Sequence, residues 1–222
     1  MKFYVLLDED FEGEIIKFDG ENYFRFVYGP NEWVHTTLFD KYKNQSKNSN
    51  KYQEISEKET IDFLVEQINL YQRLWNKAYD LAIEKHKDAI DKIGKPYILH
   101  PLYVSEQFDV YDFKIVAILH DIVEDTDVSL EDLRNMGFPN KIVKAIDYIS
   151  RRNYESYFEY IDRVKTNGIA RIVKIEDLKH NLLPERINLV ENNESLKKRY
   201  NKALKILSQE WTTYNIKKEG FC

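Results

Sequence analysis

Four short stretches of this chain together carry the side chains of a complete metal-ligand set. They contain His100, the adjacent pair His120 and Asp121, the acid pair Glu124 and Asp125, and Asp177. The His-Asp pair follows the apolar run 115–119, which predicts a buried helix. In helical spacing the acid pair lies one turn further along the same face. Burying so much charge is costly unless the groups pair or bind a cation. The pattern therefore predicts a divalent metal site, and the alternative is a helix whose polar face is solvated.

The chemistry of such a site follows from its ligand types. Two imidazoles and two carboxylates leave coordination positions open for water and for a phosphate oxygen. A metal there lowers the pKa of its bound water and withdraws charge from an attacked phosphorus atom. Glu124 or Asp125 could orient that water or carry its proton, an effect typically worth about 10²–10⁴-fold in rate. Nitrogen and oxygen ligands without thiolate suit manganese, iron or zinc, and the residues alone do not choose among them.

Composition sets the frame for this site. The 222 residues are enough for one sizeable core with a small additional module. A formal net charge of -5 argues against a dedicated nucleic-acid binder, which usually carries a basic surplus. Cys222 is the single cysteine and can form no internal disulfide, which favours a reducing compartment. No signal-peptide pattern and no bilayer-spanning apolar stretch are found, so we expect a cytoplasmic protein with no membrane partner.

The first fifty residues predict a small antiparallel β module followed by a linker. Short aromatic and β-branched runs, separated by turn residues, lie at 2–7, 14–18, 23–28 and 33–37. Asp19-Gly20 predicts a hairpin turn, and the polar stretch 43–50 is typical of a linker. We therefore expect two domains, 1–50 and 51–222. Three or four strands rarely stand alone, so the module should pack on the helical domain, on a protein partner or on a second copy of the chain.

From Ser56 onward the pattern becomes helical. Ser56 and Glu59 form a capping-box pattern, and apolar residues follow at helical spacing. Later helix ends are predicted at Gly137 and at Asn167-Gly168, and a last amphipathic helix at about 195–211. The sequence thus predicts a mainly α-helical protein, with about seven helices behind the β module.

Three segments of the chain resemble the motifs of a known protein family. The runs 94–101, 117–126 and 173–181 resemble, in order and spacing, the motifs of the hydrolase domain of RelA/SpoT-type alarmone enzymes, which belong to the HD superfamily of metal-dependent phosphohydrolases. A weaker fourth match lies at 149–151, where the family often has threonine-lysine. The resemblance covers roughly residues 66–210.

The resemblance implies a role for each matching acid and histidine. It makes the metal ligands His100, His120, Asp121 and Asp177, with manganese as the family's usual metal and iron or zinc as alternatives. Glu124 and Asp125 match the acid pair assigned to water and proton handling. The implied reaction removes pyrophosphate from the 3′ position of guanosine tetra- or pentaphosphate.

Contacts to the substrate are implied in the same way. Asn181 matches a residue placed beside the nucleotide, and Lys92 and Tyr97 fall in the segment that lines the pocket. Arg151 is one of several cations expected to neutralise a polyphosphate. His180 is expected to hydrogen-bond near the site, with a fifth ligand position as the alternative.

Two departures from the family pattern bear on the substrate. Where alarmone hydrolases often carry arginine, this chain has Asp91, which could not stack on a base and would repel phosphate. We therefore expect looser discrimination between guanine and adenine. The chain also ends about 45 residues after Asp177, so it resembles the small, hydrolase-only kind of alarmone enzyme.

The sequence analysis therefore favours a metal-dependent nucleotide phosphohydrolase, with guanosine 3′,5′-bispyrophosphate as the best single substrate. Two alternatives stay open. An HD hydrolase could act on an adenosine alarmone, a cyclic nucleotide or a nucleoside monophosphate, or the chain could be a nucleotide sensor that does not cleave. The intact pair Glu124 and Asp125 favours catalysis, because a sensor can dispense with these acids.

Overall fold

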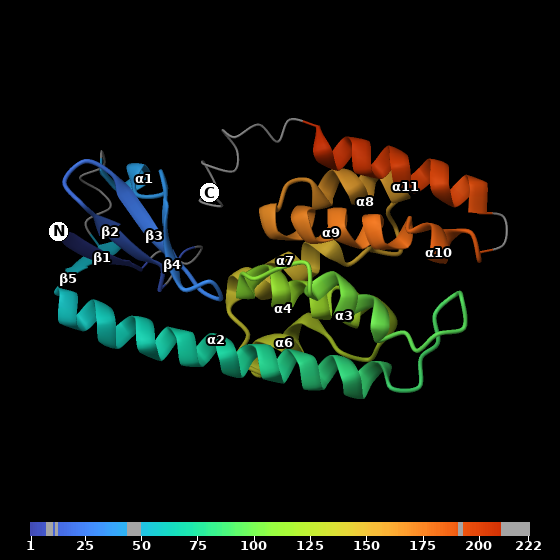
Figure 1. Cartoon of the computed structure of the whole chain (residues 1–222), viewed down its shortest axis with the longest axis horizontal. Coiled ribbons are helices and arrows are strands. Elements are labelled where there is room, and N and C mark those ends of the chain that lie inside the picture. The colour runs from blue at the N-terminus through green and yellow to red at the C-terminus, as the bar shows by residue number, and fades with distance from the viewer. Residues whose placement is uncertain (8–10, 12, 44–49, 191–192, 210–222) are drawn as a thin grey trace. The chain divides into compact units, whose positions relative to one another are not determined.

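The computed structural model describes residues 1–7, 11, 13–43, 50–190 and 193–209. They form two compact units, residues 1–73 and residues 74–209 (Figure 1). The boundary lies inside the long helix α2 (Glu57–His86). Of the helices in the described part of the chain, none is both long and apolar enough to cross a membrane.

The first unit contains a five-stranded antiparallel sheet in the order β4-β3-β2-β1-β5. Its strands are β1 (Lys2–Leu6), β2 (Ile15–Phe18), β3 (Tyr23–Val27), β4 (Glu32–His35) and β5 (Tyr52–Ile55). The first four strands confirm the predicted β module. Sequence reasoning missed β5, because Tyr-Gln-Glu-Ile is short and half polar. It is an edge strand that pairs with β1, and Phe3 lies opposite Ile55.

Aromatic side chains make the core of this sheet, as expected from its composition. Tyr4 stacks on Phe39 with ring centroids 4.7 Å apart, and Tyr23 stacks on Phe39 at 4.9 Å. Phe39 precedes the short helix α1 (Asp40–Lys43). The predicted turn at Asp19-Gly20 is present, with Asp19 Oδ1 accepting from the amides of Glu21 and Asn22. The predicted linker falls mostly on residues 44–49, outside the described residues, and the domain boundary at residue 50 stays a prediction.

The second unit is helical, which confirms the predicted fold class. After the C-terminal part of α2 it comprises α3 (Leu99–Ser105), α4 (Tyr111–Leu119), α5 (Ile122–Asp125), α6 (Leu130–Asn135), α7 (Asn140–Ile149), α8 (Tyr157–Val164), α9 (Gly168–Asn181), α10 (Pro184–Ile187) and α11 (Asn193–Ser208). The described part of the chain has more helices than the predicted seven, because α5 and α10 are additional single turns. Gly137, at a φ of +85°, follows α6 as expected.

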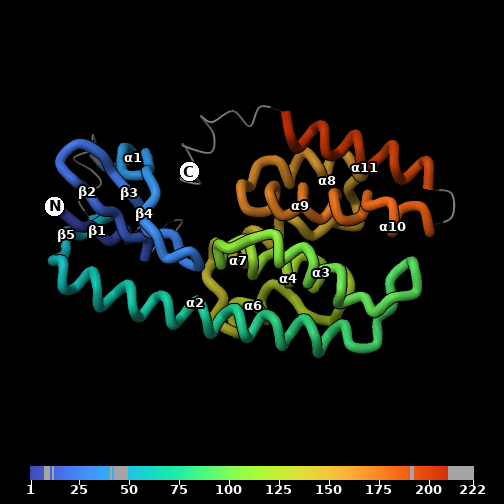
Figure 2. Tube along the Cα trace, viewed as in Figure 1, coloured from blue at the N-terminus to red at the C-terminus, as the bar shows by residue number. Residues whose placement is uncertain are grey.

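A shared core brings the functional segments together. Helix α9 packs against α3, α4 and α7. Figure 2 shows these four helices next to one another. On α4, Ile115, Val116 and Leu119 are fully buried. Burying each such side chain contributes about 1.5–3 kcal/mol relative to leaving it exposed. The rigid contact of α3, α4 and α9 therefore fixes where each helix delivers its histidine or acid.

Candidate metal centre

Three buried residues from three different segments of the helical unit meet at one point. His100 lies in the first turn of α3, His120 directly after α4, and Asp177 in the third turn of α9. The Nε2 atom of His100 lies 3.0 Å from Oδ1 of Asp177, and Nε2 of His120 lies 3.8 Å from the same oxygen. One ligand atom from each residue lies within 4.8 Å of the others. This spacing could hold a metal ion.

Asp121 completes the predicted set. Its Oδ2 lies 2.9 Å from Nε2 of His120 and 3.9 Å from Nε2 of His100. Sequence reasoning treated His120 to Asp125 as one continuous helix. The structure instead ends α4 at Leu119 and begins α5 at Ile122, so the His-Asp pair occupies the break between two helices. In this break, the side chains of both His120 and Asp121 face the proposed metal position.

The hydrogen bonds of the two imidazoles indicate what their Nε2 atoms can do. Nδ1 of His120 lies 2.7 Å from the carbonyl oxygen of Ala117, so Nδ1 carries the proton and donates it. Nε2 of the same ring is buried and, among the described residues, has no hydrogen-bond partner. It lies close to Asp121 without hydrogen-bond geometry. A buried ring nitrogen that faces two carboxylates without a hydrogen-bond partner fits a site for a divalent cation.

His100 is oriented by His180. Their Nδ1 atoms lie 2.6 Å apart, and the two rings are stacked. Burial and the neighbouring His100 and Arg186 lower the pKa of His180 to about 3, so His180 is neutral. In the tautomer in which His100 Nδ1 donates to His180, Nε2 of His100 is free to bind a cation. His180 also stacks on Tyr103 at 4.0 Å between centroids. The contact with His100 is a hydrogen bond near the site, as expected for His180.

Proton and metal compete for the same site. Burial opposes the charged form of His120, but Asp121 and Asp177 raise the pKa of the ring to about 9. At neutral pH the cation-free site therefore holds a proton near His120. A metal ion that bound there would displace it.

Asp177 is held by two neighbours on its own helix. Nζ of Lys174 lies 2.8 Å from Oδ2, and Nδ2 of Asn181 donates to Oδ1 at 2.6 Å. Burial opposes ionisation, yet Lys174 and the two histidines keep the pKa of Asp177 well below its usual range. Sequence reasoning missed Lys174, although its position three residues before Asp177 was a usable signal. Asn181 bonds a proposed ligand as well as lining the cavity.

Tyr97 holds Asp121 in the same way. Its hydroxyl donates to Oδ2 of Asp121, and burial and that charge strongly raise the pKa of the phenol. Tyr97 therefore stays a hydrogen-bond donor at physiological pH. His86, buried in the last turn of α2, packs its ring 4.9 Å from the ring of Tyr97. His86 therefore packs beside the tyrosine that holds Asp121.

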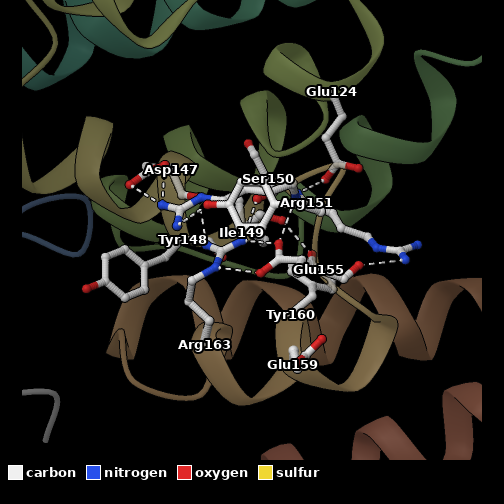
Figure 3. A network of polar contacts seen from close by, with 12 residues as sticks. Glu124, Asp147, Tyr148, Ile149, Ser150, Arg151, Glu155, Glu159, Tyr160 and Arg163 are labelled. Atoms are coloured by element: carbon white, nitrogen blue, oxygen red, sulfur yellow. Dashed lines mark hydrogen bonds and ion pairs between the residues drawn. The ribbon is translucent and has the colours of Figure 1, made fainter.

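Glu124 is fixed by the loop that follows α7. Its Oε1 accepts a hydrogen bond of 2.8 Å from the backbone amide of Arg151 (Figure 3). Desolvation by the cavity wall raises the pKa of Glu124 above its usual value. A carboxylate with a raised pKa can exchange a proton near neutral pH more readily than an ordinary glutamate. Glu124 and Asp125 are both exposed at the residue level.

Arg163, which sequence reasoning missed, organises that loop. Its Nη1 donates to the carbonyl oxygens of Asp147 and Tyr148, both at 3.0 Å, and its Nη2 donates to that of Ser150 at 2.9 Å (Figure 3). Nε and Nη2 also bond the carboxylate of Glu155, at 3.0 and 2.5 Å. One guanidinium thus ties the end of α7 to the loop that carries Arg151.

A cavity of about 360 Å³ adjoins these groups. Its wall contains the predicted residues Lys92, Tyr97, His100, Asp121, Glu124, Asp125, Arg151, Asp177 and Asn181. His120 is not among the lining residues. The wall also contains residues that sequence reasoning did not single out as site residues, namely Tyr157, Tyr160, Lys174, Arg186, Arg199 and Tyr200. These come from α8 to α11, whose meeting at this cavity no local pattern signals.

Asp91 differs from its sequence-based expectation. Its Oδ2 lies 3.1 Å from Nη1 of Arg186, and its Oδ1 accepts from the amides of Ile93 and Lys95 at 3.0 and 2.9 Å. Burial opposes its charge, but these donors hold the pKa of the carboxyl below its usual range. The expectation of an unpaired negative charge facing phosphate was wrong, because Arg186 neutralises it.

Comparison with known proteins bears on this geometry. No family model matches the chain. It is 30% identical over 102 residues to a guanosine-3′,5′-bis(diphosphate) 3′-pyrophosphohydrolase of Aquifex aeolicus, covering 44% of this chain and 14% of that protein. Proteins of the same name match from Spiroplasma citri (30% identity, 48% of this chain, 16% of the relative) and Borreliella burgdorferi (36%, 34% and 12%). The chain therefore spans less than a fifth of the length of these relatives.

A solved structure shares the fold. It is described as a metazoan ortholog of SpoT that hydrolyses ppGpp, with a TM-score of 0.53 and 20% identity, and the match covers 61% of this chain and 86% of that one. Together with the sequence relatives, this likeness confirms the resemblance to the hydrolase domain of RelA/SpoT-type enzymes.

Proposed function

We propose that this chain is a metal-dependent pyrophosphohydrolase that acts on a small phosphorylated nucleotide, with guanosine 3′,5′-bispyrophosphate as the favoured substrate. The observation that carries the proposal is the convergence of His100, His120 and Asp177, with Asp121, beside a cavity of about 360 Å³. The names of the relatives support the substrate class. The proposed products are GDP and pyrophosphate from the 3′ position.

The proposed ligands are His100, His120, Asp121 and Asp177, and the proposed metal is manganese, with iron or zinc as alternatives. When bound, such a metal supplies a water of lowered pKa and balances charge on the attacked phosphoryl group. The protein orients the four ligands itself. Tyr97 holds Asp121, Lys174 and Asn181 hold Asp177, and His180 holds His100.

In this proposal Glu124 is the group that accepts the proton of the attacking water. The amide of Arg151 directs one of its oxygens, and desolvation gives it a raised pKa. Asp125 is the second acid of the pair. Lys92 and Arg151 line the cavity and balance the charge of the polyphosphate, and Asn181 contacts the nucleotide.

Two other functions keep the same site. A hydrolase of another nucleotide would use the same ligands with different wall contacts, and a sensor would bind without cleavage. The retained acid pair Glu124 and Asp125 favours catalysis over sensing. The proposal includes a cytoplasmic location, no nucleic-acid or membrane partner, and a sheet unit that contacts a protein partner or a second copy of the chain.

A phosphate-release assay tests the proposal directly. Protein purified without chelator and supplied with manganese should release pyrophosphate, and no orthophosphate, from guanosine 3′,5′-bispyrophosphate. His120→Ala should lose both the metal and the activity. Adenosine alarmones, cyclic nucleotides and nucleoside monophosphates serve as alternative substrates. Activity confined to nucleotides without a 3′ pyrophosphate would move the protein to the second enzyme function, and binding without turnover would make it a sensor.

A further inference from the structure

One part of the cavity wall has no role in the proposed phosphate chemistry. Besides its charged groups, the wall includes Ile93 on the loop after α2, and Ile187 and Val190 at the end of α10 and just beyond it. The amide of Val190 bonds the carbonyl of Ile187, so these two lie one turn apart. Phosphate groups gain nothing from apolar neighbours, whereas a planar heterocyclic ring does. This part of the wall therefore suits the nucleoside end of a ligand.

The ion pair between Asp91 and Arg186 belongs to the same two segments of the chain as these apolar residues. Ile93 is two residues from Asp91 and donates its amide to that carboxylate, and Ile187 directly follows Arg186. The side chains of Arg186 and Asp91 are 15% and 5% exposed. Both charges are thus largely withdrawn from solvent, and Asp91 holds the guanidinium at one edge.

The ion pair with Asp91 affects which part of a ligand Arg186 can bind. Its charge is already balanced by Asp91, so it attracts a phosphate less than an unpaired cation would. Arg151 is the contrasting case in the same cavity, because it is exposed and its guanidinium donates to the neutral carbonyl of Glu155. Among the described residues, Nε of Arg186 has no hydrogen-bond partner. A planar guanidinium that is held at one edge and flanked by apolar side chains can stack on a ring.

We propose that Arg186, held in place by Asp91, is the residue that stacks on the base of the nucleotide. Ile93 and Ile187 supply the apolar surroundings of the ring. The inference rests on the proposed function only in taking the ligand to be a nucleotide. It assigns the cavity a charged part for the phosphates and a paired, apolar part for the base.

The test separates the base from the phosphates. Binding of GDP, ADP and inorganic pyrophosphate to the manganese-loaded protein is measured by calorimetry for the parent and for Arg186→Lys. Lysine keeps the charge opposite Asp91 and loses the plane. We expect the dissociation constants of GDP and ADP to rise about tenfold, as for loss of one base-stacking contact. That of pyrophosphate should change less than about twofold, and the manganese content should not change.

Two further variants sharpen the reading. Asp91→Asn still accepts the loop amides but leaves Arg186 unpaired, so pyrophosphate should bind more tightly while the nucleotides bind more weakly. Arg134→Lys, at an exposed ion pair with Glu131 on α6, is the matched control and should change neither. Thermal unfolding of each variant checks that the fold is retained.

The outcomes are distinct from those of the hydrolysis assay. An equal weakening of nucleotides and pyrophosphate by Arg186→Lys would make Arg186 a phosphate ligand and overturn the inference. Unchanged nucleotide binding, or a parent that does not bind GDP, would also overturn it. A parent that binds GDP through Arg186 but hydrolyses no nucleotide would support the inference and contradict the proposed function.

Discussion

At the scale of single residues, the site depends on hydrogen bonds that orient the proposed ligand side chains toward the metal position. The main chain fixes His120 through Ala117, while a side chain fixes His100, Asp121 and Asp177. Such outer contacts typically change metal affinity about 10- to 100-fold when they are removed. Residues that never touch the metal should therefore control its binding.

Tyr97→Phe tests this point at Asp121. The substitution keeps the ring that packs on His86 and removes the hydroxyl that donates to Asp121. We expect manganese affinity to fall about tenfold, because Asp121 loses its orienting donor. Titration of the metal-free protein with manganese measures the effect. Tyr79→Phe, on α2 outside the cavity lining, is the control, and equal affinities in both variants would remove Tyr97 from the site.

Glu124→Gln separates proton handling from metal binding. The amide still accepts from Arg151, so manganese content should stay at the parent level. Hydrolysis should fall about 10²–10⁴-fold, because the amide cannot take a proton from water. Near-normal turnover would show that Glu124 is not the base.

The pH profile supplies an independent check on Glu124. Desolvation raises its pKa, so its basic form is lost at a higher pH than that of an ordinary glutamate. With saturating manganese, hydrolysis should decrease as the pH falls through this raised pKa, and it should be fully present above it. Rates measured across acidic to neutral pH, with metal content followed in parallel, test the direction. An activity that rose toward acidic pH would contradict the assignment.

At the scale of elements, the site is assembled where helices end. His120 and Asp121 occupy the break between α4 and α5, and His100 lies in the first turn of α3. The loop after α7 contacts Glu124, and Arg163 ties the backbone of this loop to Glu155 and to the end of α7. The stability of this loop and the orientation of Glu124 should therefore change together.

Arg163→Met tests that coupling. Removing one partner of a largely buried ion pair costs about 3–5 kcal/mol, so the free energy of unfolding should fall by about that amount. Arg152→Met, on the same loop, removes a half-exposed ion pair with Asp147 and should cost less than about 1 kcal/mol. Denaturant unfolding compares the two variants. Equal losses would mean that Arg163 does not organise the loop.

At the scale of the whole molecule, the proposed chemistry lies within one of the two units. Every proposed ligand and every residue of the cavity wall lies in residues 74–209. The sheet unit supplies none of them.

Removing the sheet tests this division. The predicted boundary at residue 50 would leave β5 without β1, its partner strand, so the truncated chain should instead begin at Ser56. That residue keeps the cap of α2, since its Oγ accepts from the amide of Glu59 at 3.2 Å. We expect the shortened chain to bind about one manganese per chain, as the donor set implies. A folded but metal-free product, judged by circular dichroism and elemental analysis, would contradict the division.

The sequence by itself determined the parts of this protein that depend on local spacing. The helical class, the first four strands and the cap at Ser56 all follow from residue patterns within single segments. The ligand types and the family resemblance pointed to His100, His120, Asp121 and Asp177 as one set. Only the tertiary structure decided what joins distant segments. It paired Asp91 with Arg186, placed Arg163 behind Glu124 and added β5 to the sheet. The physical reason is that a long side chain or an edge strand chooses its partner by packing and desolvation, which act between segments far apart in sequence and leave no periodic trace in either one.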